Sequence, residues 1–406
     1  MTTTIYGREY YILEADAGTD ITELLTKAFS KHKNVLLERP YVISRPVEIK
    51  DNCRLRNRGK GSISSPKMRI FDINGNDNSL EDVNLSPLGL VNPAGWAAAV
   101  IFIRGGGNSI RVNMNYNFSD EYPSGIWMQG PQSKGNTISG CKLNSVSINY
   151  DYGASYNIIE GNEINNSAAN SISGIGNGNL ICRENKILSN IIRNAGRVAI
   201  EDINNTYGTI AKGNTIIGSG VRPFANGQGM GISTVGIKPL VLGNIVKDFK
   251  GLAIEISGTR GGTVEGNIIE DNTHTKYGIN LNWRTASDKD YGIPVIKSND
   301  ISGCKWAIEG GGTIQPRAII SENHIRDFGE AGIRLDCEVE GVDFTITNNK
   351  FYYERLKTSD RLAMRLNGGW KGNQKLINKG NEFIYLNGVS EEVEVFDNIS
   401  RINKAS

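Results

Sequence analysis

The sequence contains few of the residues on which several classes of protein depend. Its 406 residues include five cysteines and three histidines, and no two cysteines have the C-x-x-C spacing of a metal site. The formal net charge is +2, without the basic excess that is typical of nucleic-acid binding. No apolar run approaches the ~18 residues of a membrane-spanning helix. We therefore expect no cofactor, no metal, no nucleic-acid partner and no membrane partner.

Glycine, in contrast, is abundant, with 48 residues. Glycine-rich bends separate short segments in which every second residue is apolar, among them Arg197–Ile203, Gly229–Ser233, Gly251–Ser257 and Tyr277–Asn282. A second phrase, which begins with Gly-Asn, stands between them at Gly213–Ile216, Gly243–Val246 and Gly266–Ile269. The phrases recur in a fixed order every 22 to 32 residues. Repetition at this period, without helices in between, predicts a β-solenoid.

The repeats align into two columns of ten positions each. The first column is apolar and contains Ile126, Ile148, Ile172, Ile200, Ile232, Ile254, Ile279, Ile308, Ile333 and Met364. The second contains Cys141, Asn162, Asn185, Asn214, Asn244, Asn267, Asn299, Asn323, Asn349 and Asn381. We expect the apolar column to face the interior. We expect the asparagines to be structural, because Asn tolerates the left-handed conformation at a bend and can bond to the Asn one turn away.

The N-terminal part predicts a short helix followed by short strands. Residues 21–31 have the apolar spacing of one helix face, and Glu23 stands three residues after Asp20, as in a capping box. Such a helix would cover the open edge of the first turn. The strands expected next are Val35–Leu37, Tyr41–Ile43, Val47–Ile49 and Arg54–Arg56.

This order of a helix, a strand, Tyr41-Val-Ile-Ser44, Val47-Glu-Ile49 and Arg58-Gly-Lys-Gly61 resembles the opening of pectate-lyase-like parallel β-helix proteins, and in particular the phage tailspike and polysaccharide depolymerase branch. The resemblance implies an all-β chain wound as a single-stranded right-handed parallel β-helix with a short N-terminal capping helix. It also implies a polysaccharide substrate, a homotrimer, and a virion-associated or extracellular place. The N-terminus lacks a signal-peptide core, so export would be non-classical, and a cytoplasmic place stays open.

Four segments are expected along the chain. They are an N-terminal arm at residues 1–18, the capping helix and first strands at 19–61, the parallel β-helix at 62–388, and a C-terminal cap at 389–406.

The candidate site follows from the residues next to the apolar column, since successive side chains of a strand point to opposite faces. The outward column contains Trp127, Asn149, Ser173, Glu201, Ser233, Glu255, Asn280, Glu309, Arg334 and Arg365. Carboxylates and amides bind hydroxyls and aromatic rings bind sugar faces, so this composition predicts a glycan groove. Glu201, Glu255 and Glu309 recur at every second turn, about 9.6 Å apart at a strand spacing of roughly 4.8 Å. That separation is at the long end of the range for inverting glycosidases.

A fourth carboxylate, Asp202, falls at a position where neighbouring turns place apolar core residues. Such a carboxylate either turns outward at a bulge or stays buried, and both situations recur at active sites. We therefore name Glu201, Asp202, Glu255 and Glu309 as catalytic candidates. The expected substrate contacts are Asn280, Asn282, Trp283, Arg334, Asp336, Arg365 and Trp127.

Three functions remain open from the sequence. Hydrolysis by a carboxylate pair is favoured, because the sequence shows neither a compact aspartate cluster like the calcium site of pectate lyases nor the Asp-Pro-His-Asp motif of epimerases. The first alternative is a lyase or a glycan transferase on the same fold. The second is a β-helix that binds glycans or serves assembly without catalysis.

Overall fold

The structure of the protein is a computed structural model. It describes residues 1–66, 69–87, 99–116, 123–222, 229–258, 260–282, 292–312, 317–337, 343–353, 362–367, 375–385, 390–392 and 396–397. The chain forms two compact units, Met1–Gly196 (unit 1) and Arg197–Ser406 (unit 2). It is an all-β parallel solenoid of about 12 turns, and the described residues contain one short helix. The predicted fold class is confirmed, whereas the four-segment division stays a prediction.

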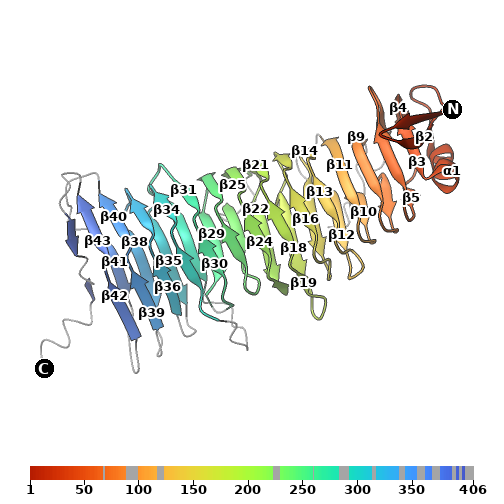
Figure 1. Ribbon diagram of the computed structural model, residues 1–406. Coiled ribbons are helices and arrows are strands. Elements are labelled where there is room, and N and C mark those ends of the chain that lie inside the picture. Colours follow the sequence, from red (N-terminus) through yellow and green to blue (C-terminus); the bar gives the residue numbers. More distant parts are fainter. Residues whose placement is uncertain are drawn as a thin grey trace, which may run out of the picture. The chain divides into compact units, whose positions relative to one another are not determined.

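In each unit one set of strands forms a continuous parallel sheet, here called the front sheet, and the remaining strands are the back strands (Figure 1). The front sheet of unit 1 contains β5 (Val47–Ile49), β8 (Phe71–Ile73), β10 (Ala99–Ile103), β12 (Ser124–Gln129), β15 (Ser147–Asp151) and β18 (Ile172–Gly176). The front sheet of unit 2 contains β22 (Val198–Asn204), β26 (Met230–Thr234), β29 (Leu252–Ser257), β32 (Tyr277–Asn282), β35 (Trp306–Gly312), β38 (Ala331–Cys337), β41 (Leu362–Asn367) and β45 (Phe396–Asp397).

The back strands are mostly shorter. In unit 1 they are β1 (Thr2–Ile5), β2 (Arg8–Ile12), β3 (Asn34–Leu37), β4 (Pro40–Val42), β6 (Arg54–Asn57), β7 (Ser62–Ser65), β9 (Ser79–Pro87), β11 (Ser109–Asn115), β13 (Thr137–Ser139), β14 (Lys142–Asn144), β16 (Ile158–Glu160), β17 (Glu163–Asn165), β19 (Cys182–Arg183), β20 (Lys186–Leu188) and β21 (Ile191–Ala195). In unit 2 they are β23 (Thr206–Tyr207), β24 (Ile210–Lys212), β25 (Thr215–Ser219), β27 (Leu240–Leu242), β28 (Ile245–Phe249), β30 (Thr263–Glu265), β31 (Ile268–Glu270), β33 (Val295–Lys297), β34 (Asp300–Ser302), β36 (Arg317–Ser321), β37 (His324–Arg326), β39 (Asp343–Thr347), β40 (Lys350–Tyr353), β42 (Lys375–Lys379), β43 (Glu382–Tyr385) and β44 (Ser390–Glu392).

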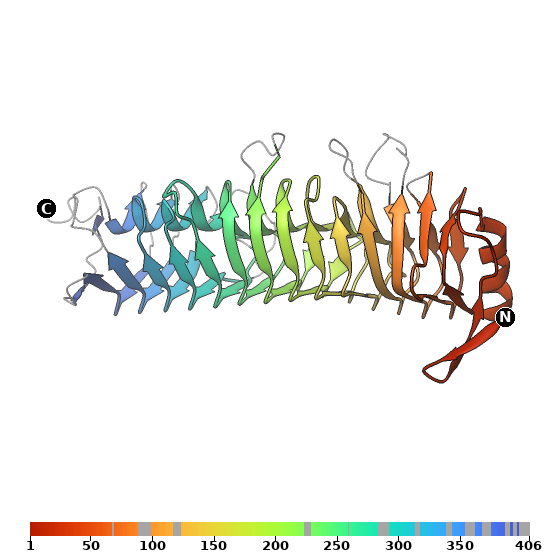
Figure 2. The same ribbon diagram turned by 90° about the horizontal axis from the view of Figure 1, so that it is seen from above.

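The first turn of unit 1 is covered by the helix α1 (Thr22–His32), which begins one residue later than expected. Asp20 accepts hydrogen bonds from the backbone N–H of Thr22 at 3.0 Å and from its hydroxyl at 2.6 Å. Glu23 forms an ion pair with Arg45 instead of closing a capping box. The helix contacts β2, β3 and β5, and the antiparallel hairpin β1–β2 projects beside it (Figure 2).

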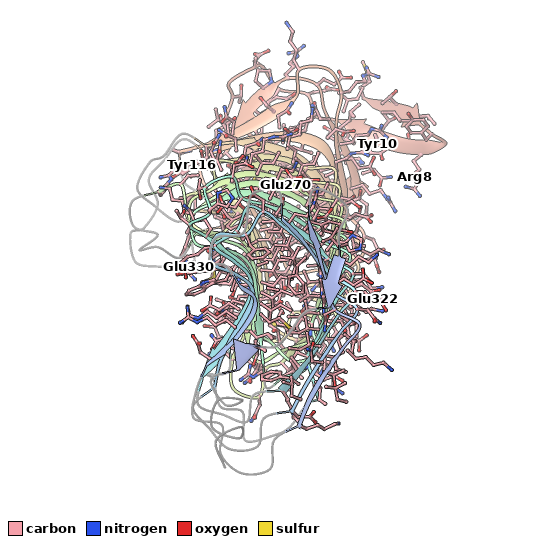
Figure 3. All side chains as sticks on the ribbon, turned by 90° about the vertical axis from the view of Figure 1, so that its left-hand side faces the viewer. Arg8, Tyr10, Tyr116, Glu270, Glu322 and Glu330 are labelled. Atoms are coloured by element: carbon pink, nitrogen blue, oxygen red, sulfur yellow. The ribbon has the colours of Figure 1, made fainter. Side chains whose placement is uncertain are left out.

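The apolar column fills the interior as predicted. In unit 1, Ile126 pairs with Ile148, which pairs with Ile172. In unit 2 the pairing runs without interruption from Ile200 to Met364. All of these side chains are fully buried or nearly so, and burying one of them contributes roughly 1.5–3 kcal/mol. Figure 3 shows side chains filling the space between the walls that carry Glu330 and Glu322.

The asparagine column is a hydrogen-bonded ladder inside the turn. In unit 2 each side chain from Asn214 to Asn381 lies next to the following one, as with Asn244 Nδ2 and Asn267 Oδ1 at 2.9 Å. Two details of the prediction are wrong. Asn190, not Asn185, follows Asn162, because Asn185 belongs to a second ladder with Asn157. The left-handed residue is the one before each asparagine, such as Gly243 or Gly266.

Two glycines with similar φ angles should differ in how much stability the protein loses when each is replaced by alanine. Gly243 has φ +58° and open space where a Cβ would lie, whereas Gly303 has φ +70° and would place a Cβ 1.3 Å from the carbonyl oxygen of Asp271. We expect Gly243→Ala to cost only the left-handed strain, about 1–2 kcal/mol. Gly303→Ala should lower the thermal midpoint further, since a backbone oxygen must move. Equal midpoints for the two variants would contradict this packing.

Candidate functional site

The outward column of unit 2 lies on the front sheet in the order expected from the sequence. Strand register pairs Glu201 with Ser233, Ser233 with Glu255, and so on through Asn280, Glu309, Arg334 and Arg365. A parallel row contains Ser257, Asn282, Gly311, Asp336 and Asn367. Two strand spacings therefore separate Glu255 from Glu309, with Asn280 between them.

Glu255 is held in one orientation by neutral neighbours. The Ser233 hydroxyl donates to its Oε2 at 2.7 Å, and Asn282 Nδ2 donates to its Oε1 at 3.0 Å. The contact with Asn282 is diagonal, because the register partner of Glu255 is Asn280. The side chain is half-buried, so it can both hold this position and meet a ligand.

Glu309 lies next to a cation whose position is fixed. Arg334 follows it in the register, with its guanidinium carbon 3.6 Å from the centre of the Trp306 ring. Arg334 also forms an ion pair with Asp336. Stacking and pairing restrict an otherwise flexible arginine, so a positive charge stands beside the Glu309 position.

An aromatic pair beside this column was missed by the sequence analysis. The rings of Tyr277 and Trp306 stack with centroids 4.8 Å apart and planes 20° apart. Tyr277, Arg334 and Lys305 all cover the Trp306 ring, with Lys305 Nζ 4.7 Å from its centre, and the residue is 8% exposed. The pair therefore positions Arg334 and does not offer a free stacking surface. Both aromatics stand two residues before the apolar column, which was the available signal.

Trp306 is anchored further by Glu330, which accepts from Trp306 Nε1 at 3.0 Å and pairs with Lys305 at 3.1 Å. Burial alone would raise the pKa of Glu330. The hydrogen bonds from Lys305 and Trp306 and the charges of Lys305 and Arg334 outweigh it, so that the pKa lies below its ordinary value.

Two of the four catalytic candidates are buried. Glu201 is 5% exposed and forms an ion pair with Arg197. Asp202 is 1% exposed and pairs in register with Thr234, so the buried alternative holds and no bulge turns it outward. Neither carboxylate has the access to a large ligand that Glu255 has.

Some of the remaining substrate contacts expected from the sequence lie on the front sheet, and one lies outside the described residues. Asn280 and Asn282 are half-buried and Arg365 is exposed on the same face. Trp283 lies outside the described residues. Within the described ranges, no group of three or more histidine, cysteine, aspartate or glutamate side chains is placed to hold a metal ion. The described helix is too short to cross a membrane.

Trp127 lies in unit 1 and lines a separate cavity of about 50 Å³ with Asn149 and Asp151. It is 6% exposed and meets Phe102 edge-on, with centroids 5.4 Å apart. Asp151 is 8% exposed. Burial raises its pKa to about 7, and hydrogen bonding by the side chains of Trp127 and Gln129 opposes this with a smaller lowering effect. Asp151 stands two residues after Asn149 on β15 and therefore shares the outward face of the strand, but it was not among the site residues expected from the sequence.

No model of a known protein family matches the sequence, and no curated protein matches it. Several solved structures resemble the fold. The surface adhesin PfbA of Streptococcus pneumoniae is 14% identical, with a TM-score of 0.50 over 93% of this chain and 94% of that one. A GH87 α-1,3-glucanase catalytic unit from Streptomyces thermodiastaticus is 15% identical, with a TM-score of 0.47 over 89% and 70%. The tailspike of E. coli bacteriophage HK620, solved with a pentasaccharide, is 10% identical, with a TM-score of 0.48 over 91% and 78%. At these identities the likeness is one of fold alone, and the fold of this chain is the parallel β-solenoid described above.

Proposed function

We propose that the protein cleaves a bacterial surface or storage polysaccharide by glycoside hydrolysis on the front sheet of unit 2. The observation that supports this most is the placement of Glu255. It is half-buried, oriented by Ser233 and Asn282, and two strands away from a second carboxylate, Glu309. Amide and cationic side chains continue the same face, which suits a hydroxyl-rich chain laid across the strands.

The two carboxylates take different roles because their neighbours differ. Glu255 contacts neutral side chains among the described residues, whereas Glu309 has a cation as its neighbour, so within this pair we assign Glu255 as the proton donor to the glycosidic oxygen. Glu309 has the fixed Arg334 as its register neighbour, and a nearby cation favours the ionised form. Glu309 is therefore the base that takes a proton from water.

The reaction balances with these two groups and one water molecule. The bond between the anomeric carbon and the glycosidic oxygen breaks, and the leaving sugar takes the proton of Glu255. Water supplies the hydroxyl on the anomeric carbon and gives its other proton to Glu309. A separation of about 9.6 Å, from two strand spacings, leaves room for that water and favours inversion.

Asn280, Asn282 and Asp336 are placed to bind hydroxyls, and Arg334 and Arg365 to bind acidic groups of the glycan. Glu201 and Asp202 are buried beneath this face, and we assign them a structural role in place of the catalytic one. A homotrimer in a virion-associated or extracellular place is part of the same proposal.

The test is incubation of the purified protein with bacterial capsular, O-antigen and storage polysaccharides, with reducing ends and ultraviolet absorbance measured in parallel. New reducing ends without absorbance support hydrolysis. Absorbing unsaturated products would replace hydrolysis with elimination. Binding without products would replace cleavage with a receptor role.

A further inference from the structure

The cavity beside β12, β15 and β18 in unit 1 combines polar groups with apolar walls. Asp151, Asn149 and Ser173 are among its polar lining, and Pro123, Ala168 and Ile175 are among its apolar lining. A sugar ring has the same two characters, with hydroxyls at its edge and C–H groups on its faces. A cavity of about 50 Å³ has room for about four water molecules.

The carboxyl of Asp151 is the group in this cavity whose hydrogen bonding a ligand would complete. The residue is 8% exposed, and its Oδ1 is fully enclosed without a hydrogen-bond partner. Trp127 and Gln129 both approach the carboxyl closely enough to lower its pKa, but Trp127 Nε1 is itself enclosed without a partner, and Oδ1 of Asp151 stays unsatisfied. Buried carboxyls are costly unless they are hydrogen-bonded, and a donor brought by a ligand would remove that cost.

Among the residues that the structure describes, no cation contributes to the pKa of Asp151. The flanking strands β12 and β18 contain no ionisable side chain, and neither does the segment of residues 167–171. On β15 the other ionisable residue is Tyr150, which is fully buried and lies beneath Gly174. The charge of Asp151 is therefore not balanced by the elements packed around it.

We propose that this cavity is a separate binding site for a single neutral sugar residue, with a ligand hydroxyl donating to Asp151. The choice of a sugar over another hydroxyl compound rests on the proposed function, whereas the site itself rests on the cavity and the unsatisfied carboxyl. It lies in unit 1, apart from the residues assigned to cleavage in unit 2.

The protonation of Asp151 gives the binding a direction with pH. The pKa in the folded protein is about 7, raised from 3.8 by burial. A hydroxyl donates more strongly to the ionised carboxylate than to the neutral acid, so affinity should rise between pH 5.5 and pH 8.5. The stability of the unligated protein changes with pH in the opposite direction to the affinity. Asp151 binds its proton more tightly in the folded state than in the unfolded state, so ionising it disfavours folding. The unligated protein loses stability as pH rises from 3.8 through 7, and Asp151→Asn should raise its thermal midpoint at pH 8.5 more than at pH 5.5.

The experiment is saturation-transfer NMR with the methyl glycosides of glucose, galactose, mannose, rhamnose and N-acetylglucosamine, with tetramethylammonium as a cationic comparison. We expect at least one glycoside to bind more tightly at pH 8.5. Asp151→Asn should weaken it on the order of 10- to 100-fold, as for a lost bond to a charged group, and remove the pH dependence. The control is Asp72→Asn. Asp72 lies on β8 of the same sheet and pairs with Arg69 at 3.2 Å, so its replacement should change neither the affinity for the glycoside nor the pH dependence of binding.

Every outcome of this experiment either supports the proposed binding site or overturns it. Binding of no glycoside would leave a hydration site and overturn the proposal, as would binding of tetramethylammonium alone. Equal affinity in the wild type and in Asp151→Asn would also overturn it. The Glu255→Gln/Glu309→Gln variant should keep this binding, so loss of cleavage and loss of the unit 1 site are distinguishable.

Discussion

Replacing Glu255 and Glu309 together with glutamine is expected to abolish cleavage of the glycan while the protein stays folded. Glutamine keeps the shape of the side chain but can neither give nor take the proton. General acid and base groups each contribute on the order of 10²–10⁴-fold to a rate. Each single variant should therefore lose a factor in that range, and the double variant should be indistinguishable from buffer in an assay of reducing ends.

A matched control exists on the back strands of the same unit. Glu265 and Glu270 are ion-paired with Lys297 at 3.0 Å and with Lys247 at 2.6 Å, and both are about two-fifths exposed. The double variant Glu265→Gln/Glu270→Gln makes the same chemical change away from the front sheet and should keep full activity. Full activity in Glu255→Gln/Glu309→Gln, with its circular dichroism spectrum unchanged, would remove these two residues from the mechanism.

Asn267→Ala should cause the largest loss of stability among single substitutions of polar residues. The Oδ1 of Asn267 accepts from the backbone N–H and from Nδ2 of Asn244, each at 2.9 Å. Its Nδ2 donates to Asn299 Oδ1 at 2.9 Å and to the carbonyl of Val241 at 3.0 Å. Alanine would break these four hydrogen bonds. The Asn244 amide would keep the carbonyl of Ala211 and Asn299 Oδ1 would keep the backbone N–H of residue 267, whereas the buried backbone N–H of Asn244 would lose its acceptor. At about 1 kcal/mol for each bond, we expect a loss of roughly 3–5 kcal/mol.

Urea denaturation should report this loss, and amide hydrogen exchange should place it in the turns around β28 and β31, since solenoid turns depend mainly on their neighbours. Asn272→Ala is the control, because Asn272 is exposed, and it should change stability by less than about 0.5 kcal/mol. A similar effect of the two substitutions would mean that the ladder contributes little to stability.

The sequence by itself determined the solenoid, the inward column and the order of side chains along the front sheet. An alternation of period two assigns residues to faces without reference to the rest of the chain, and the Gly-Asn phrases mark the bends. For this reason the pairing of Glu255 with Asn280 and of Glu309 with Arg334 could be predicted. The ladder could be predicted in kind, because one buried amide is best satisfied by the same amide one turn away.

Only the tertiary structure decided which polar side chains are accessible. Two consecutive buried residues, Gly278 and Ile279, interrupt the alternation and turn Tyr277 to the outside, so the aromatic pair beside Arg334 does not follow from period two. Glu201 and Asp151 stand at outward positions in the sequence pattern, yet neighbouring turns and bends enclose them. Enclosure depends on side chains brought together from separate turns. The cavity at Asp151 and the burial of Glu201 therefore become visible only when the turns are stacked.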